Sequence, residues 1–264
     1  MEKTQDEEWD YYTCNGKKVC VATDREAAYG RTIGEIPLKK YVLCALTNHR
    51  DTDSIGSPAP QVLIVKNIKK LPVKVVVMAY LTAEYGILAQ YQKGVRNICG
   101  YTLPAGLKEN QKLSSLLIIP VMNNHILSKE AIFAEGLVDE SIYDSMEATA
   151  TELFRKGAEN AEKNNLILAT AQYEFGEENN TAIPLHSYHT YKTATFWDNG
   201  IKVEPVVIKN WLESVGFKGN GPAPPIPEDI KKQASQEYIT LYKKLTGKEL
   251  KVPKKEKDIA EFLK

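Results

Sequence analysis

The densest group of side chains capable of acid–base chemistry lies in residues 186–191, which read His-Ser-Tyr-His-Thr-Tyr. We interpret this segment as the most polar strand of the chain. Residues three apart on a strand point to opposite faces, so His186 and His189 are poorly placed to share a metal ion. The four cysteines are Cys14, Cys20, Cys44 and Cys99. They form no Cys-x-x-Cys pair and have no histidine at zinc spacing, which predicts buried, reduced thiols in a cytoplasmic protein and no metal site.

The charge balance limits the partners that the chain can bind. It has 264 residues, with 34 Lys+Arg and 34 Asp+Glu, so its formal net charge is zero. Neutrality argues against nucleic-acid binding through a broad basic face and against polybasic membrane association. No apolar run reaches the ~18 to 20 residues of a transmembrane helix, and the acidic first fifteen residues lack a secretory signal. We therefore expect a small-molecule ligand, no nucleic acid and no membrane, and we leave open a homo-oligomer.

Apolar periodicity predicts the elements that must position these residues. The β-branched runs 18–22, 61–65 and 73–81 are typical of strands, as is the segment 166–175. Gly176 to Asn180 is interpreted as a polar turn, with a strand restarting at 182–185, so the two strands would form a hairpin. Helical spacing predicts a helix capped by Ser128, a second over about 139–163, and a third from Pro227 to Gly247. This mixture predicts the α+β class.

Short motifs also follow one another along nearly the whole chain. They include Val21–Arg25 (VATDR), Leu71–Val77 (LPVKVVV), Leu103–Asn110 (LPAGLKEN), Tyr173–Gly176 (YEFG) and Pro222–Pro227 (PAPPIP). Each motif alone is weak. In this order they resemble the SAICAR synthetases, the phosphoribosylaminoimidazole-succinocarboxamide synthetases of purine biosynthesis.

The resemblance implies a fold and a reaction. A small antiparallel-sheet domain would pack on a larger α+β domain, with ATP in an ATP-grasp-like cleft, and we place the two lobes at residues 1–82 and 83–264. The family uses ATP to phosphorylate a carboxylate on an aminoimidazole ribonucleotide, and the amine of aspartate then displaces the phosphate. This chemistry needs cations around phosphates and carboxylates, and protein carboxylates that hold magnesium.

The resemblance also implies which residues line that cleft. It assigns catalytic roles to Glu174 and His186, where His186 stands at the position of a metal-binding carboxylate and would act as a general acid, base or ligand contact. Substrate-binding roles fall to the following residues: Asp24, Arg25, Lys39, Tyr80 and Lys192. Two alternatives stay open: Asp24 and Arg25 as a structural ion pair, and Lys39 as a surface lysine. No metal ligands are assigned, and ATP with magnesium is expected only for an ATP-dependent ligase.

Most charged positions of the family pattern are replaced in this chain. Neutral side chains stand at Met78, Asn123, Thr170, Gln172 and Thr195, and the family's glycine-serine turn is Ala83-Glu84. Lys3 restores the family's N-terminal phosphate-binding lysine only with a three-residue slip. Each lost cation near a phosphate removes a contact of roughly 1.5 to 3 kcal/mol. The four lost cations (Met78, Asn123, Gln172, Thr195) predict a loss of many orders of magnitude in binding or rate.

Three functions remain compatible with this pattern. The first is a diverged enzyme that does not make SAICAR and acts on a less anionic, nucleoside-like or amino-acid-like molecule in the inherited cleft. The second is an ATP-dependent amide ligase with rearranged metal ligands and a new substrate. The third is a catalytically silent homologue that binds a metabolite or a protein.

Overall fold

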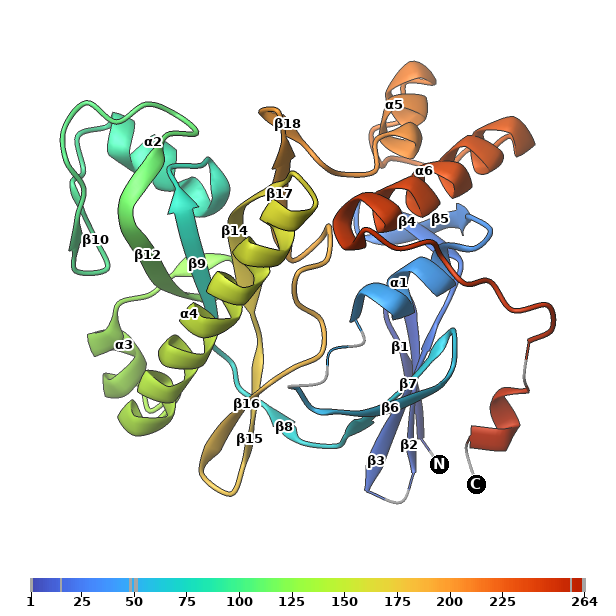
Figure 1. Ribbon diagram of the computed structural model, residues 1–264, viewed down its shortest axis with the longest axis horizontal. Helices are drawn as coiled ribbons and strands as arrows, with labels where there is room; N and C mark the ends of the chain where they lie inside the picture. The colour runs from blue at the N-terminus through green and yellow to red at the C-terminus, as the bar shows by residue number, and fades with distance from the viewer. Residues whose placement is uncertain (1, 15, 48, 50–51, 257, 263–264) are drawn as a thin grey trace. The chain divides into compact units, whose positions relative to one another are not determined.

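The computed structural model describes residues 2–14, 16–47, 49, 52–256 and 258–262 (Figure 1). The chain divides into two compact units. Unit 1 comprises Met1–Asn67 with Val203–Lys264, and unit 2 comprises Ile68–Lys202. This division differs from a boundary after residue 82. The difference arises because the strand Lys74–Tyr80 is hydrogen-bonded on both sides to strands of unit 2.

Unit 1 contains a five-stranded antiparallel sheet. Its strands, in spatial order, are β1 (Glu2–Gln5), β2 (Trp9–Cys14), β3 (Lys17–Ala22), β7 (Val62–Lys66) and β6 (Ser54–Ala59). A separate hairpin pairs β4 (Arg25–Ala28) with β5 (Arg31–Glu35). The runs 18–22 and 61–65 therefore form central strands, as the sequence predicts, because their β-branched side chains are buried against the unit's core.

Among its described residues, unit 1 also has three α-helices and a 3₁₀ turn. They are α1 (Lys39–Thr47), α5 (Val207–Ser214), α6 (Glu228–Thr246) and η2 (Ile259–Phe262). Helix α6 is confirmed with its predicted ends: Pro227 occupies the N-cap and Gly247 ends it in the left-handed region at φ 69°. Helix α1 packs against α6 and β3.

Unit 2 contains a six-stranded antiparallel sheet. Its spatial order is β13 (His125–Ile126), β12 (Lys112–Met122), β9 (Lys74–Tyr80), β14 (Ile167–Tyr173), β17 (Ala194–Asp198) and β18 (Ile201–Lys202). A three-stranded sheet contains β16 (Thr181–Pro184), β15 (Phe175–Glu178) and β8 (Lys69–Lys70), and β10 (Asn97–Ile98) pairs with β11 (Tyr101–Thr102). The predicted strand at 73–81 is β9, and its Val75, Val76 and Val77 are buried between neighbouring strands.

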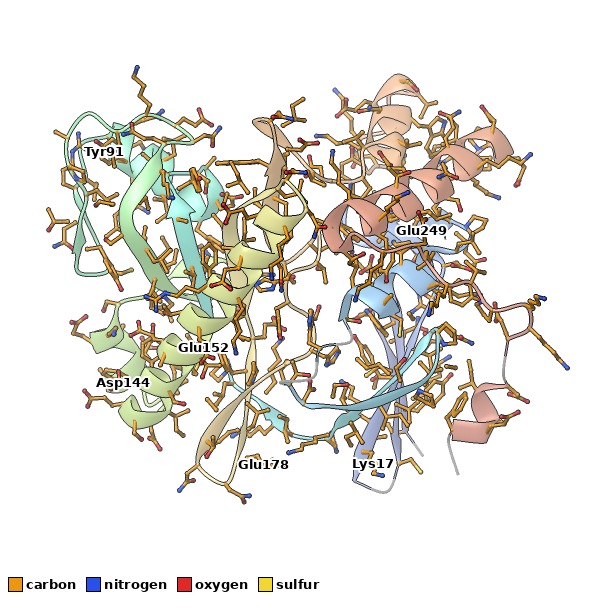
Figure 2. The ribbon with its side chains drawn as sticks, in the orientation of Figure 1. Lys17, Tyr91, Asp144, Glu152, Glu178 and Glu249 are labelled. Carbon is orange, nitrogen blue, oxygen red and sulfur yellow. The ribbon has the colours of Figure 1, made fainter. Side chains whose placement is uncertain are left out.

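The helices of unit 2 lie beside this sheet. They are η1 (Glu84–Gly86), α2 (Ile87–Gln92), α3 (Lys129–Ala134) and α4 (Glu140–Lys163). Ser128 caps α3 by accepting a hydrogen bond from the Ala131 amide at 3.1 Å, as the sequence predicts. Helix α4 packs against β9, β14 and β16, while exposed Asp144 and Glu152 lie on the face turned away from them (Figure 2). Within the described ranges, no helix combines the length and apolar composition needed to cross a membrane.

Two sequence predictions in unit 2 are wrong. Residues 185–193 form bends and turns rather than the polar strand expected at 186–191. His189 has a φ of 55°, and its Nε2 lies 2.6 Å from the Tyr173 hydroxyl. The hairpin turn is also shorter than expected, because Gly176 belongs to β15 and only Asn179-Asn180 makes the turn. Both asparagines have positive φ, as a two-residue turn of this type requires.

Candidate functional site

A polar pocket of about 140 Å³ lies in unit 2, where β14 and β17 meet η1. Thr170 and Gln172 are two residues apart on β14, so they point to one face of the sheet, and Thr195 pairs with Thr170 in the register of β17. Three positions at which the family pattern would place charged side chains therefore come together. The pocket is lined by Val76, Glu84, Tyr85, Thr170, Ala171, Gln172, Tyr191, Lys192, Thr193, Ala194, Thr195 and Lys202.

The Glu84 side chain links the 3₁₀ turn η1 to the strand β17. The Thr195 hydroxyl donates to Glu84 Oε1 at 2.7 Å. The second carboxylate oxygen, Glu84 Oε2, is buried and has no hydrogen-bond partner among the described residues. An unpaired buried oxygen costs about 1–3 kcal/mol, and more when charged, so this atom is an unused hydrogen-bond acceptor.

Gln172 anchors the other side of the pocket. Its Oε1 accepts from Lys74 Nζ at 3.0 Å and from the Tyr85 hydroxyl at 2.8 Å. Burial, with the nearby charges of Glu84 and Glu174, raises the pKa of Tyr85 to about 12, so Tyr85 is a protonated donor at neutral pH. Tyr85 adopts a left-handed backbone at φ 54° and ψ 19°, a strain of order 1–3 kcal/mol for a residue other than glycine. The chain accepts this strain where the tyrosine hydroxyl meets Gln172.

The structure brings only part of the predicted site to this pocket. Lys192 lines it. Glu174 lies just after β14 and forms an ion pair with Lys70 at 2.7 Å, with its side chain 31% exposed. His186 is half-buried in the irregular segment 185–193. The catalytic roles of Glu174 and His186 stay predictions.

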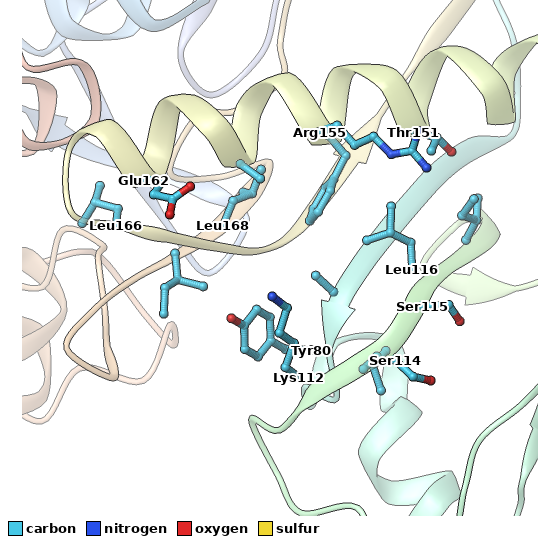
Figure 3. Close-up of a pocket in the computed structure, with 16 residues that line it drawn as sticks. Tyr80, Lys112, Ser114, Ser115, Leu116, Thr151, Arg155, Glu162, Leu166 and Leu168 are labelled. Carbon is cyan, nitrogen blue, oxygen red and sulfur yellow. The ribbon is translucent and has the colours of Figure 1, made fainter.

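Tyr80 lies in a different hollow of unit 2. This groove of about 750 Å³ is bounded by β9, β12, β14 and α4 (Figure 3). Its walls are largely apolar, and exposed Lys112, Arg155 and Glu162 contribute charges. The ring of Tyr80 contacts Trp197 edge-on with centroids 5.0 Å apart. We take the smaller pocket as the candidate site, because it brings together Thr170, Gln172 and Thr195, three positions at which the family pattern has charged side chains.

In unit 1, Asp24 and Arg25 contact protein groups. Arg25 forms an ion pair with Asp10 at 2.7 Å and donates to the Trp9 carbonyl, while Lys3 pairs with Asp10 at 3.0 Å. Burial raises the pKa of Asp10, but the hydrogen bonds from Arg25 and Lys3 outweigh it and hold that pKa below its usual value. Asp24 accepts from the Lys40 amide at 3.1 Å, which caps the start of α1.

Lys39 is the most deeply buried charge of unit 1, with 1% of its side chain exposed. Its Nζ lies 3.0 Å from Glu8 and 2.9 Å from Glu26, and it donates to the Arg25 carbonyl at 2.8 Å. Tyr238 of α6 donates to the same Glu26 oxygen at 2.8 Å. The alternative of a surface lysine is therefore wrong. Substrate binding by Asp24, Arg25 and Lys39 stays a prediction.

The side chains of the polar pocket do not fit a magnesium ion. Magnesium prefers an octahedron of oxygen ligands with one or two carboxylates. The lining offers one carboxylate, Glu84, together with two lysines, Lys192 and Lys202. Across the part of the chain that the structure describes, no three His, Cys, Asp or Glu side chains gather in a metal-binding arrangement.

Antiparallel sheets with covering helices define an α+β protein. A sequence profile of SAICAR synthetase matches residues 9–216. The phosphoribosylaminoimidazole-succinocarboxamide synthase of Legionella pneumophila (strain Lens) is 34% identical over an alignment of 269 positions, which covers 90% of this chain and 85% of that protein. A "putative phosphoribosylaminoimidazole-succinocarboxamide synthase 2" of Mesorhizobium japonicum is 30% identical, with 90% and 86% covered. The chain belongs to the SAICAR synthetase family.

Solved structures share the fold. The SAICAR synthase of Saccharomyces cerevisiae complexed with SAICAR superimposes with a TM-score of 0.77 at 23% identity, covering 93% of this chain and 94% of that one. A SAICAR synthetase in complex with ADP gives a TM-score of 0.68 at 15% identity, covering 95% and 100%. At these identities the likeness shows the fold alone. The resemblance and the α+β class predicted from the sequence are confirmed.

Sequence reasoning missed Glu84, Tyr85 and Lys74 as site residues. Glu84 was noted only as a departure from the family's glycine-serine turn. The available signal is position, since Glu84-Tyr85 lies in the connection that begins after the central strand β9, and connections of this kind carry functional side chains. The partners of Glu84 and Tyr85, Thr195 and Gln172, are 111 and 87 residues away in sequence and gave no local signal.

Proposed function

We propose that this chain is an enzyme of the SAICAR synthetase family that does not make SAICAR at a useful rate. Its substrate would be a less anionic, nucleoside-like or amino-acid-like small molecule, bound in the polar pocket of unit 2. The observation that carries the proposal is the set of neutral side chains at Thr170, Gln172 and Thr195, which meet in one pocket together with an added carboxylate, Glu84.

The contacts in the pocket support a change of ligand rather than decay. Thr195 and Glu84 bond to each other, and Gln172 is bonded by both Lys74 and Tyr85. Random loss of charged residues would leave the remaining polar groups unconnected, whereas here Thr195 is bonded to Glu84 Oε1 and Gln172 to Lys74 and Tyr85.

Two further replacements are explained by the fold. Met78 is wholly buried in the core of unit 2, so it does not contact a ligand. Asn123 has a φ of 50° in the two-residue turn between β12 and β13, where asparagine is favoured over lysine. Neither position can supply the cation of the family pattern, so a phosphoribosyl carboxylate would lose contacts worth roughly 1.5 to 3 kcal/mol each.

A direct assay tests this proposal. The protein is supplied with ATP, magnesium, aspartate and the carboxylated aminoimidazole ribonucleotide, and the L. pneumophila relative is assayed in parallel. Two lost charge-assisted contacts alone predict a rate at least about a hundredfold lower than that of the relative. Turnover equal to that of the relative would refute the proposal.

An ATP-dependent amide ligase with a new substrate is a second candidate. The observation in its favour is that relatives at 30–34% identity carry the name of a synthase of this kind. The pocket itself offers no fit for magnesium, so we assign no metal-dependent step to it. A thermal shift with ATP that requires magnesium, of the size that mass action predicts, would favour this candidate. If no metabolite shifts the unfolding temperature but a protein copurifies stably, the chain is a silent binding homologue.

A further inference from the structure

One carboxylate oxygen of Glu84 lacks a hydrogen-bond partner, and this bears on which ligand groups the candidate pocket prefers. Glu84 Oε1 is used by Thr195, whereas Oε2 is buried without a partner in the described part of the chain. A buried carboxylate oxygen that lacks a partner loses its hydration without compensation. The hydrogen bonding of the Glu84 carboxylate is therefore satisfied only when a ligand supplies a donor to Oε2.

Three hydrogen-bond donors next to Glu84 are directed to acceptors other than its Oε2. Tyr85 and Lys74 both donate to Gln172, and Thr195 donates to Glu84 Oε1. An amide oxygen accepts two hydrogen bonds, so Gln172 Oε1 has no capacity left. None of these three donors is directed to Glu84 Oε2, which leaves that oxygen for the ligand.

Lys192 and Lys202 are also among the residues that line the pocket. A cationic side chain is suited to an acceptor oxygen on a ligand, while a carboxylate such as Glu84 is suited to a donor nitrogen. A group that has an N–H donor and a carbonyl acceptor side by side matches both, and a primary carboxamide is the smallest such group. Its volume also suits a cavity of about 140 Å³, which is smaller than the ~300 Å³ needed by a complete drug-sized ligand.

We propose that Glu84 makes this pocket select a ligand bearing an N–H donor, such as a primary carboxamide, over the isosteric carboxylate. The inference rests on the proposed function, because it concerns the ligand of the same pocket. A carboxylate in the same place would put two negative oxygens against each other at Glu84 Oε2. The amide donates a charge-assisted hydrogen bond there instead.

Isosteric pairs of amino acids test this selection. We would measure the dissociation constants of L-asparagine against L-aspartate, and of L-glutamine against L-glutamate, by titration calorimetry without ATP. The members of each pair differ only by NH₂ in place of O⁻. For at least one pair we expect the amide to bind on the order of ten- to a hundredfold more tightly.

The Glu84→Gln variant tests whether the preference for the amide over the carboxylate depends on Glu84 Oε2. Its side-chain amide can keep the Thr195 bond through its oxygen, and its NH₂ can donate to a ligand carboxylate. The amide-to-carboxylate ratio is then expected to fall to about one or to reverse. Glu159→Gln removes an exposed carboxylate of α4 outside the pocket and is the matched control, with the ratio unchanged. Circular dichroism and the unfolding temperature report whether both variants fold.

The outcomes separate this inference from the proposed function. Equal binding within both pairs, no binding of any of the four probes, or an unchanged ratio in folded Glu84→Gln would overturn the role of Glu84. None of these results bears on whether SAICAR is made. Conversely, relative-like SAICAR formation with an intact amide preference would refute the proposed function and leave the role of Glu84 standing.

Discussion

Replacing Lys39 by methionine tests whether this residue is structural or contacts a substrate. Methionine keeps most of the length of the lysine side chain and removes its charge. Glu8 and Glu26, which are 7% and 8% exposed, would then face each other without the cation that lies 3.0 and 2.9 Å from them. We expect the variant to destabilise unit 1 while the candidate pocket, which belongs to unit 2, keeps its ligand affinity.

The magnitude follows from the burial of the three charges. Removing one partner of a buried ion pair leaves an uncompensated charge and costs about 3–5 kcal/mol. Lys39→Met is expected to lower the free energy of unfolding by that amount. Adding Glu8→Gln and Glu26→Gln should restore most of it, because the remaining side chains are then neutral.

Urea unfolding followed by tryptophan fluorescence measures the change, since Trp9 lies next to Glu8 in unit 1. A lower midpoint with an unchanged slope would report stability alone. Lys40→Met is the matched control, because Lys40 is 20% exposed and its pairs with Asp24 and Glu256 are worth about 0–1 kcal/mol. A loss below 1 kcal/mol for Lys39→Met, together with weakened ligand binding, would refute the structural role.

Three further predictions concern other contacts. Gly157→Ala should destabilise unit 2 by about 1–3 kcal/mol in thermal unfolding despite the better helix propensity of alanine, because its Cβ would lie 2.3 Å from the His189 ring. The lowered pKa of Asp10 stabilises the fold at neutral pH. That stability is lost as the pH falls through the folded-state pKa, so Asp10→Asn should flatten the acid limb of a urea-midpoint profile. Glu256→Gln removes a 2.7 Å pair with Lys40 and should speed proteolysis of residues 248–256 with little change in global stability.

Two of these predictions have a control variant, and the third has an outcome that would contradict it. Glu159→Ala, exposed on the same helix as Gly157, should change stability by less than about 0.5 kcal/mol. An unaltered acid limb in Asp10→Asn would mean that other carboxylates dominate acid unfolding. Glu249→Gln, whose ion pair with Lys243 is more exposed, should not accelerate proteolysis as Glu256→Gln does.

The segments that the sequence predicted correctly are those with local signals. Helix α4 runs over Glu140–Lys163, within a residue of the prediction, because its apolar stripe repeats at helical spacing. The ends of α6 follow from Pro227 and Gly247, whose backbone preferences suit a helix start and a left-handed end. The Asn199-Gly200 pair between β17 and β18 was an equally local hairpin signal that our sequence analysis did not use.

The amino-acid sequence by itself determined the family, the α+β class and most helix and strand positions, because these depend on the order of residues and on neighbours a few positions away. Tertiary structure alone decided that 185–193 is irregular, because His189 bonds to Tyr173 and packs against Gly157 rather than following its own polar alternation. It also decided the pairing of Glu84 with Thr195 across 111 residues. Such contacts depend on which strands become neighbours in the sheet, and that pairing is set by burial of the whole core rather than by any local pattern.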